Sequence, residues 1–254
     1  MNASACGSRF RDFLFIIVLI SPANLFSARI CSGQTDSKAT RSNYVISVQD
    51  LKMSGKAHAA FTKGSHMLAK GETAKSIAYL EQAIAQYPEH YEAYYNLGVA
   101  HLRLSHLAEA EQAFQKAIDL TKGNFAPPQV GLAAILCQKA EFPEAETLLQ
   151  RAVEIEPGSA VGKYYLAWAQ FGLNRLVEAE RSVEQALLRN AKLAQAYLLL
   201  IRIHLRQHNL PGASKDLEAY LKIEPLDEPA KNLAEEIQQE MAQQAAAVVA
   251  TARP

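Results

Sequence analysis

The residues best suited to chemistry are the histidines and cysteines, and their spacing does not build a catalytic or metal site. His204 and His208 lie four residues apart, a spacing that places two metal ligands on one helical face. No third ligand accompanies them, so a packed histidine with a hydrogen-bond partner is favoured, and a metal-dependent activity is the last alternative. Cys137 has nothing beside it in sequence that would activate a thiol. No Ser/His/Asp or Cys/His spacing and no glycine-rich phosphate loop occurs. The sequence therefore predicts a non-enzyme with no cofactor and no metal.

The balance of charge argues against nucleic acid and acidic substrates as partners. The chain has 26 basic and 26 acidic residues, so no global field favours nucleic acid or an acidic substrate. No basic stripe with interleaved aromatic residues is present, which argues against nucleic-acid binding. The alanine-rich, helix-favouring composition beyond the N-terminal leader predicts an all-α chain.

A pattern of small and large residues recurs every 34 or 35 positions. The small residues of this pattern are Ser76, Ala110, Ala145, Ala179 and Ala213. Four positions after each of them stands a large apolar residue: Leu80, Phe114, Leu149, Val183 and Leu217. Small residues let two helices approach closely and large ones fill the space between them, so the recurrence indicates stacked helical pairs.

The clearest copy of the pattern spans residues 94–117. Tyr94, Leu97 and Gly98 are followed by Ala110 and Phe114 at the spacing of the tetratricopeptide repeat (TPR), which this stretch resembles. The resemblance implies an all-α TPR solenoid of about five helix-turn-helix repeats within a TPR domain at 51–227. The expected repeats span about 57–90, 91–124, 126–159, 160–193 and 194–227.

The segments before the repeats have other roles. Residues 1–33 place Arg9 and Arg11 before the apolar run Phe13–Ile20 and then small residues, which predicts a signal peptide or an uncleaved signal anchor. Residues 34–50 are small and polar and read as a linker. Asp50 has the chemistry of an N-cap, so the first helix is expected to start near Leu51 and to run through Ala69.

Residues 228–254 are expected to form a capping helix and a tail. Their apolar residues lie on one stripe: Ala230, Leu233, Ala234, Ile237 and Met241. A solenoid needs such a polar-backed terminal helix for solubility. A second small series follows three positions after the large residues and consists of Ala83, Ala117, Ala152 and Ala186. Tyr220 breaks this series in the last repeat, so this repeat is expected to accept the stripe instead of another repeat.

The TPR resemblance also implies a partner-binding groove lined by the first helix of each pair. Carrying the family's groove positions onto this chain gives a set of aromatic, aliphatic and basic residues, listed here in chain order: Phe61, Tyr95, Val99, Arg103, Tyr164, Trp168, Phe171, Arg202 and Arg206. Trp168 and Tyr164 share one helical face, and Arg202 stands one repeat after Trp168, so Arg202 is expected beside it. The competing interpretation is that Trp168 belongs to the core between two repeats.

One TPR subfamily binds a peptide carboxylate through basic and Asn residues, and this chain does not match it. The corresponding positions hold Phe61, Ser65, Asn96, Pro127 and Gly131, of which only the Asn agrees. The predicted function is a non-catalytic protein–protein interaction scaffold. It would be exported to the periplasm or cell envelope, bind a protein or peptide partner, and touch the membrane only through an uncleaved anchor. The alternative is an envelope assembly factor that acts through self-association.

Overall fold

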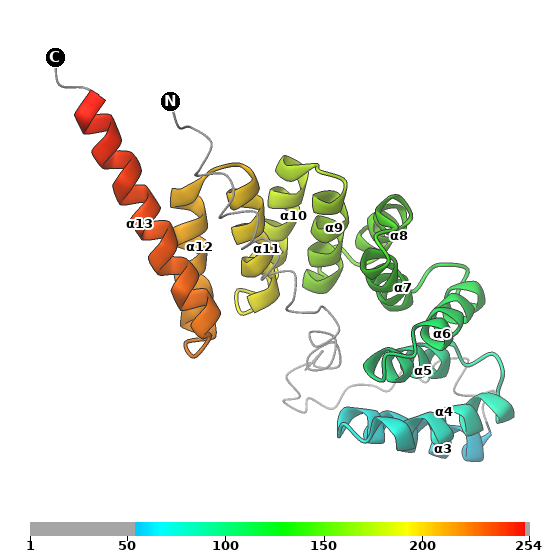
Figure 1. Cartoon of the computed structure of the whole chain (residues 1–254). Helices are drawn as coiled ribbons and strands as arrows, with labels where there is room; N and C mark the ends of the chain where they lie inside the picture. The colour runs from blue at the N-terminus through cyan, green and yellow to red at the C-terminus, as the bar shows by residue number, and fades with distance from the viewer. Residues whose placement is uncertain (1–53, 252–254) are drawn as a thin grey trace, which may run out of the picture. The chain divides into compact units, whose positions relative to one another are not determined.

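The computed structural model describes residues 54–251, and the predicted leader and linker lie outside this range. Within it the chain forms eleven α-helices and no strand, which confirms the predicted all-α fold. The chain divides into two compact units, residues 1–122 and 123–254. The described residues of the first unit form α3 to α6, and those of the second form α7 to α13 (Figure 1).

The first unit consists of two helical pairs. Its helices are α3 (Gly55–Ala69), α4 (Thr73–Gln86), α5 (Tyr91–Arg103) and α6 (Leu107–Leu120). The expected start of the first helix at Leu51 is wrong, because Ser54 has an extended backbone and its side-chain oxygen accepts a hydrogen bond from the Ala57 amide at 3.2 Å. Ser54 is therefore the N-cap, in place of Asp50. The predicted end of this helix at Ala69 is confirmed.

The second unit consists of three helical pairs and a terminal helix. The pairs are α7 (Ala126–Gln138) with α8 (Phe142–Ile155), α9 (Ala160–Gly172) with α10 (Leu176–Arg189), and α11 (Ala194–Arg206) with α12 (Leu210–Ile223). The terminal helix is α13 (Glu228–Thr251). Proline stands in the first turn of α7, α8 and α12, where an amide donor is not needed.

The turn inside each pair has one and the same backbone conformation. A residue with positive φ follows each first helix, and these five residues are Gly71, Ser105, Ala140, Asn174 and His208. The amide of the next residue donates to a carbonyl five positions earlier, as Glu72 does to Met67 at 2.9 Å and Asn209 to His204 at 2.8 Å. This is the Schellman arrangement, which satisfies the last carbonyls of a helix. The turns thus repeat in backbone conformation and hydrogen bonding, just as the helices repeat in sequence.

The small and large residues of the repeat pack as expected. A Cβ atom added at Gly98 would lie 2.6 Å from the Phe114 ring, and one added at Gly64 would lie 2.9 Å from Leu80. Phe114 and Leu80 are completely buried. The close approach of α5 to α6, and of α3 to α4, thus depends on the absence of a side chain at these two positions.

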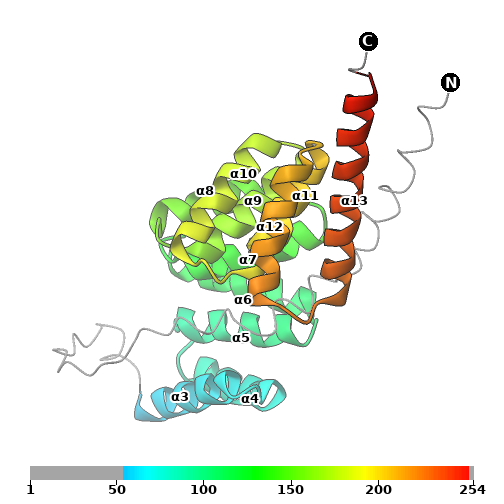
Figure 2. The same ribbon diagram turned by 90° about the vertical axis from the view of Figure 1, so that its left-hand side faces the viewer.

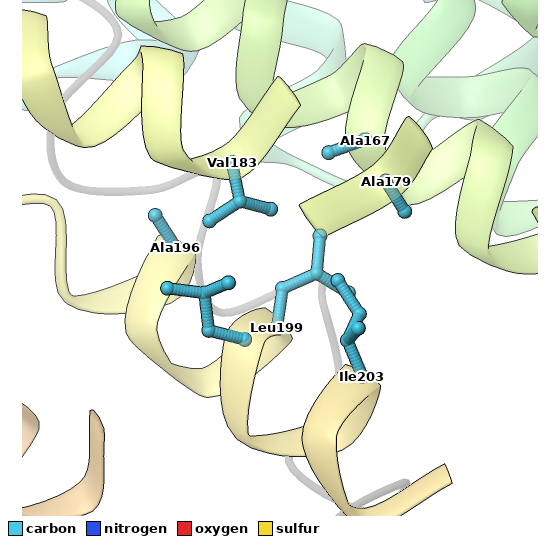
Figure 3. Packing of buried hydrophobic residues seen from close by; sticks show 7 residues of the cluster. Ala167, Ala179, Val183, Ala196, Leu199 and Ile203 are labelled. Atoms are coloured by element: carbon cyan, nitrogen blue, oxygen red, sulfur yellow. The ribbon is translucent and has the colours of Figure 1, made fainter. Parts of the chain in front are cut away.

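The same principle builds the core of the second unit. Figure 3 shows Ala167 of α9 and Ala179 and Val183 of α10 facing Ala196, Leu199 and Ile203 of α11. All of these residues are at most 4% exposed. The cluster joins two successive pairs and fixes α11 against α9 and α10.

The terminal helix α13 covers α12, and Figures 1 and 2 both place the two helices side by side. Ala230, Leu233 and Ile237 of α13 are buried, at 7%, 4% and 0% exposure. The Tyr220 hydroxyl donates to Asp227 Oδ2 at 2.6 Å, and Asp227 Oδ1 accepts from the Ala230 amide at 3.0 Å. The bulky residue that ends the small series thus holds the N-cap of the helix that ends the repeats.

Candidate partner-binding face

Three aromatic side chains of α9 form a row along one side of the helix. Tyr164, Trp168 and Phe171 stand four and three residues apart, so their side chains point the same way. The rings of Tyr164 and Trp168 have centroids 6.3 Å apart, and Tyr165 stacks on Trp168 at 5.9 Å with an interplanar angle of 21°. Tyr164, Trp168 and Phe171 are all partly buried, and all three pack against the cluster of Figure 3.

Trp168 has features of both interpretations, the residue of the binding groove and the residue of the core between two repeats. Its ring packs against the core shared by α9, α10 and α11, as the core interpretation requires. The same side chain keeps part of its surface accessible, since it is not among the buried residues. A substitution of Trp168 consequently changes the stability of the fold as well as this surface.

Arg202 of α11 interacts electrostatically with the row. Burial raises the pKa of the Tyr164 hydroxyl, and the positive charge of Arg202 partly opposes this rise. Burial also lowers the pKa of Arg202, with Tyr164 as the charge partner. Tyr164 lies one turn before Trp168 on α9 and is an electrostatic partner of Arg202. The placement of Arg202 beside Trp168 itself stays a prediction.

A second arginine of α11 covers the end of the row. The guanidinium carbon of Arg206 lies 5.4 Å from the centroid of the Phe171 ring, a cation–π contact. Its Nη2 donates to Asn174 Oδ1 at 2.8 Å. We call the surface made by Tyr164, Trp168, Phe171, Arg202 and Arg206 the α9–α11 face.

The predicted site residues of the first unit are engaged within the unit. Phe61 packs against the cluster of Ala60, Ala83 and Ala93, and its ring lies 4.3 Å from that of His90. The Tyr95 ring lies 6.1 Å from that of Phe114. Val99 is 1% exposed, so its side chain does not reach the surface.

Arg103 also bonds within the first unit. Its Nη1 donates to the Leu68 carbonyl at 2.6 Å, in the last turn of α3. A cation at the C-terminus of a helix is favourable because it meets the negative end of the helix dipole. Arg103 and Arg206 occupy the same place in their repeats, and each reaches the end of the preceding first helix.

The single match to the carboxylate-binding subfamily has a partner inside the chain. Asn96 Nδ2 donates to Ser65 Oγ at 2.9 Å, which links α5 to α3. Both residues stand at positions of the carboxylate clamp, and here they bind each other.

Sequence reasoning missed a charged network around His204. Its Nδ1 lies 2.8 Å from Asp216 Oδ2 of α12, and its Nε2 lies 3.2 Å from Glu180 Oε1 of α10. Gln207 Nε2 donates to Glu180 Oε2 at 2.9 Å; this bond lowers the pKa of Glu180, while burial raises that of Asp216. The interpretation of His204 as a packed histidine with a hydrogen-bond partner is confirmed. Its two partners escaped detection because they lie on other helices, and no local spacing announces them.

The described part of the chain offers little for other kinds of site. Among residues 54–251 no three His, Cys, Asp or Glu side chains gather in a way that would hold a metal ion. In the same range no helix is both long and apolar enough to cross a lipid bilayer. His208 lies exposed in a turn with φ of 57°, away from the network of His204.

Comparison with protein families explains the repeat. Two models described as tetratricopeptide repeat match residues 61–125 and 138–195. The chain is a tetratricopeptide repeat protein. A curated relative, the tetratricopeptide repeat and J domain-containing co-chaperone DNJ1 of Fusarium oxysporum f. sp. lycopersici, is 27% identical over 155 residues. The match covers 54% of this chain and 30% of that relative, so the TPR protein spans less than a third of it.

Solved structures agree with the fold. PilW, described as a widely conserved type IV pilus biogenesis factor, superposes with a TM-score of 0.64 at 15% identity, covering 74% of this chain and 93% of PilW. YrrB, described as a TPR protein with an unusual peptide-binding site, gives 0.56 at 18% identity, covering 70% of this chain and 92% of YrrB. These likenesses establish the TPR solenoid. The two TPR family matches support a protein–protein interaction scaffold.

Proposed function

We propose that this TPR protein is a non-catalytic scaffold that holds a segment of a partner protein against the α9–α11 face. The observation that carries the proposal is the row of partly accessible aromatic rings beside Arg202 and Arg206. Aromatic residues and arginine are the types that dominate the energetics of protein interfaces. In the first unit Val99 is buried, and Asn96 and Arg103 donate hydrogen bonds within the unit, so we assign this unit a smaller share of the binding.

Cys137 and His204 are both poorly placed for catalysis. Burial raises the pKa of the Cys137 thiol to about 12, so its nucleophilic thiolate is scarce at neutral pH. Both ring nitrogens of His204 face carboxylates, which leaves neither nitrogen for a substrate. These two observations support a binding function over an enzymatic one.

We place this function in the periplasm or cell envelope. The proposal rests on the order of Arg9, Arg11, the apolar run Phe13–Ile20 and the small residues after it. The likeness of the fold to a pilus biogenesis factor is consistent with it. Mass spectrometry of the protein from fractionated cells is expected to show the loss of residues up to about Ala28. A mature protein that keeps Met1 in the membrane fraction would instead indicate a signal anchor.

The binding face can be tested by photo-crosslinking. Replacing Phe171 by a photoreactive phenylalanine keeps an aromatic ring under Arg206, and we expect ultraviolet light to join it to a partner protein in intact cells. Leu188 of α10 is the matched control, because it is 85% exposed and lies on a second helix of the same unit. Crosslinks at position 188 but not at 171 would refute the assignment of the face.

Binding energy can then be measured with the partner so obtained. Arg202→Ala together with Arg206→Ala is expected to weaken binding by at least about 2 kcal/mol, the scale of an interface hot spot. Circular dichroism is the control for folding, and unchanged affinity with unchanged helicity would contradict the proposal. If position 171 crosslinks only to a second copy of this chain, and the mass by light scattering rises with concentration, self-association is the function instead.

A further inference from the structure

Acidic residues are absent from the first helices of the second unit. The helices α7, α9 and α11 carry Lys163, Arg202 and Arg206 and contain no Asp or Glu. The second helices α8 and α10 carry six glutamates: Glu144, Glu146, Glu154, Glu178, Glu180 and Glu184. The same two helices also carry Arg151, Arg181 and Arg189, so it is the acidic residues alone that are segregated between the two sets of helices.

The segregation also divides α11 itself. His204 faces Glu180 of α10 and Asp216 of α12. Arg202 and Arg206 each stand two residues from His204, which turns their side chains by about 200° to the opposite side of the helix. On that side Arg206 contacts Phe171 and Arg202 interacts with Tyr164. The carboxylates and the two arginines are therefore on opposite sides of α11.

The surroundings of the arginines strengthen their effect on a bound group. Arg202 is partly buried, and burial lowers its pKa. A charge in such a place is poorly hydrated, and its attraction for an opposite charge is stronger than in bulk water. Arg206 is exposed and held over an aromatic ring, so its planar group is oriented before a partner arrives.

We propose that the segment bound by the α9–α11 face is acidic, with two carboxylates at alternate positions of an extended stretch and an apolar side chain next to them. This rests on the proposed function and names its partner class. Residues four apart on a helix have Cβ atoms about 5–6 Å apart. Alternate residues of an extended chain are about 7 Å apart and point the same way, so one carboxylate meets each arginine. The apolar side chain lies against Trp168 and Phe171.

Charge decides between this occupant and others. Residues 1–53 of the chain contain six Lys or Arg and three Asp, so they have the same sign as the face and do not complement it. A second copy would have to offer its acidic second helices, which are rigid and carry basic residues as well, such as Arg181 and Arg189. A separate extended acidic segment complements the charge of both arginines without these conflicts.

The experiment is selection from a random-peptide display library on the immobilised full chain. Peptides with two acidic residues at alternate positions and a neighbouring apolar residue are expected to be enriched at least about tenfold over the starting library. Arg202→Gln with Arg206→Gln is expected to abolish this enrichment. Arg181→Gln with Arg189→Gln removes the same charge from exposed positions of α10 and is expected to retain it.

Each other outcome overturns the inference in a distinct way. Enrichment of neutral or basic peptides that is lost in Phe171→Ala would overturn the acidic partner and leave the binding face in place. Acidic peptides that bind equally well to both pairs of glutamine variants would show that the arginines do not select them. No enrichment of any peptide, together with no crosslink at position 171, would overturn the inference and the proposed function together.

Discussion

Equivalent positions of the two units hold residues of different character. Where the second unit has Trp168 on α9 and Leu199 on α11, the first unit has Ser65 on α3 and Asn96 on α5. Leu199 belongs to a buried cluster against which Trp168 packs, whereas Asn96 donates a hydrogen bond to Ser65 at 2.9 Å. One backbone arrangement therefore joins successive first helices by apolar burial in one unit and by a polar contact in the other.

The histidines show the same contrast. His101 and His204 occupy one position of the repeat, on α5 and α11. His204 lies between Glu180 and Asp216, while His101 has its closest polar contact with His106, 3.5 Å between the two Nδ1 atoms. The helices thus fix the place of a side chain, and the neighbouring helices decide what it does there.

The largest expected difference in stability between the two units lies at the end of the second unit, where α13 covers α12. Deletion of the residues after Asp227 is expected to cost about 5 kcal/mol, because it exposes the α12 surface that covers Leu233 and Ile237. Hydrogen exchange is expected to speed up in α12 and to remain slow in α4, and the protein is expected to aggregate. A truncated protein that stays monomeric with an unchanged melting temperature would contradict the capping role.

The next test substitutes Trp168 and Ser65, which occupy the same position of the repeat in the two units. Trp168→Ala is expected to destabilise the protein by about 3 kcal/mol, since it removes a ring from the edge of a core. Ser65→Ala is expected to cost only about 1 kcal/mol, the value of one hydrogen bond. Urea unfolding of both variants measures the difference. Equal costs would mean that the two interfaces are alike in energy.

A third test removes the histidine that lies between two carboxylates. His204→Phe is expected to cost about 2 kcal/mol at neutral pH, because Asp216 Oδ2 loses its hydrogen-bond partner at 2.8 Å in a largely buried site. His204→Phe combined with Asp216→Ala is the control, and it is expected to recover part of the loss. A single variant as stable as the parent protein would show that the network adds nothing to stability.

A smaller effect is expected at the turns. Gly71 and Ala140 occupy one turn position with φ of 81° and 62°, a conformation that suits glycine. Ala140→Gly is expected to stabilise the protein by about 0.5–1 kcal/mol, and Gly71→Ala to destabilise it by a similar amount. Thermal unfolding measures both. A loss of stability in Ala140→Gly would mean that flexibility of the unfolded chain outweighs the relief of the turn.

The smallest effect concerns the pH dependence of the first unit. Burial lowers the pKa of His101 in the folded protein below its ordinary value. As the pH falls below the ordinary pKa, the unfolded chain binds the proton more readily than the folded chain, so the protein loses stability. His101→Phe is therefore expected to show a smaller loss of stability between neutral pH and about pH 5. Unfolding curves at both pH values provide the comparison, and an unchanged difference would contradict it.

The fold was predictable and the α9–α11 face only partly so. Series such as Ala110 and Phe114 report contacts between neighbouring helices, and such contacts repeat with the sequence. The burial of Val99 and the bond of Arg103 to the Leu68 carbonyl could not be read in this way, because they depend on which atoms of another pair lie opposite. The first helix start was missed for a local reason, since Ser54 and Asp50 are equally good caps and only the structure chooses between them.

The uniform turn has a consequence for how such a chain changes in evolution. Asn174 and His208 leave their helices with the same backbone conformation and the same hydrogen bonds. Recombination that joined Asn174 directly to Asn209 would thus restore an identical junction after losing one whole repeat, and a duplication would restore it after gaining one. Length can therefore vary by complete modules without inventing a new connection, and each added module would bring its own pair of inner-face residues for selection to act upon.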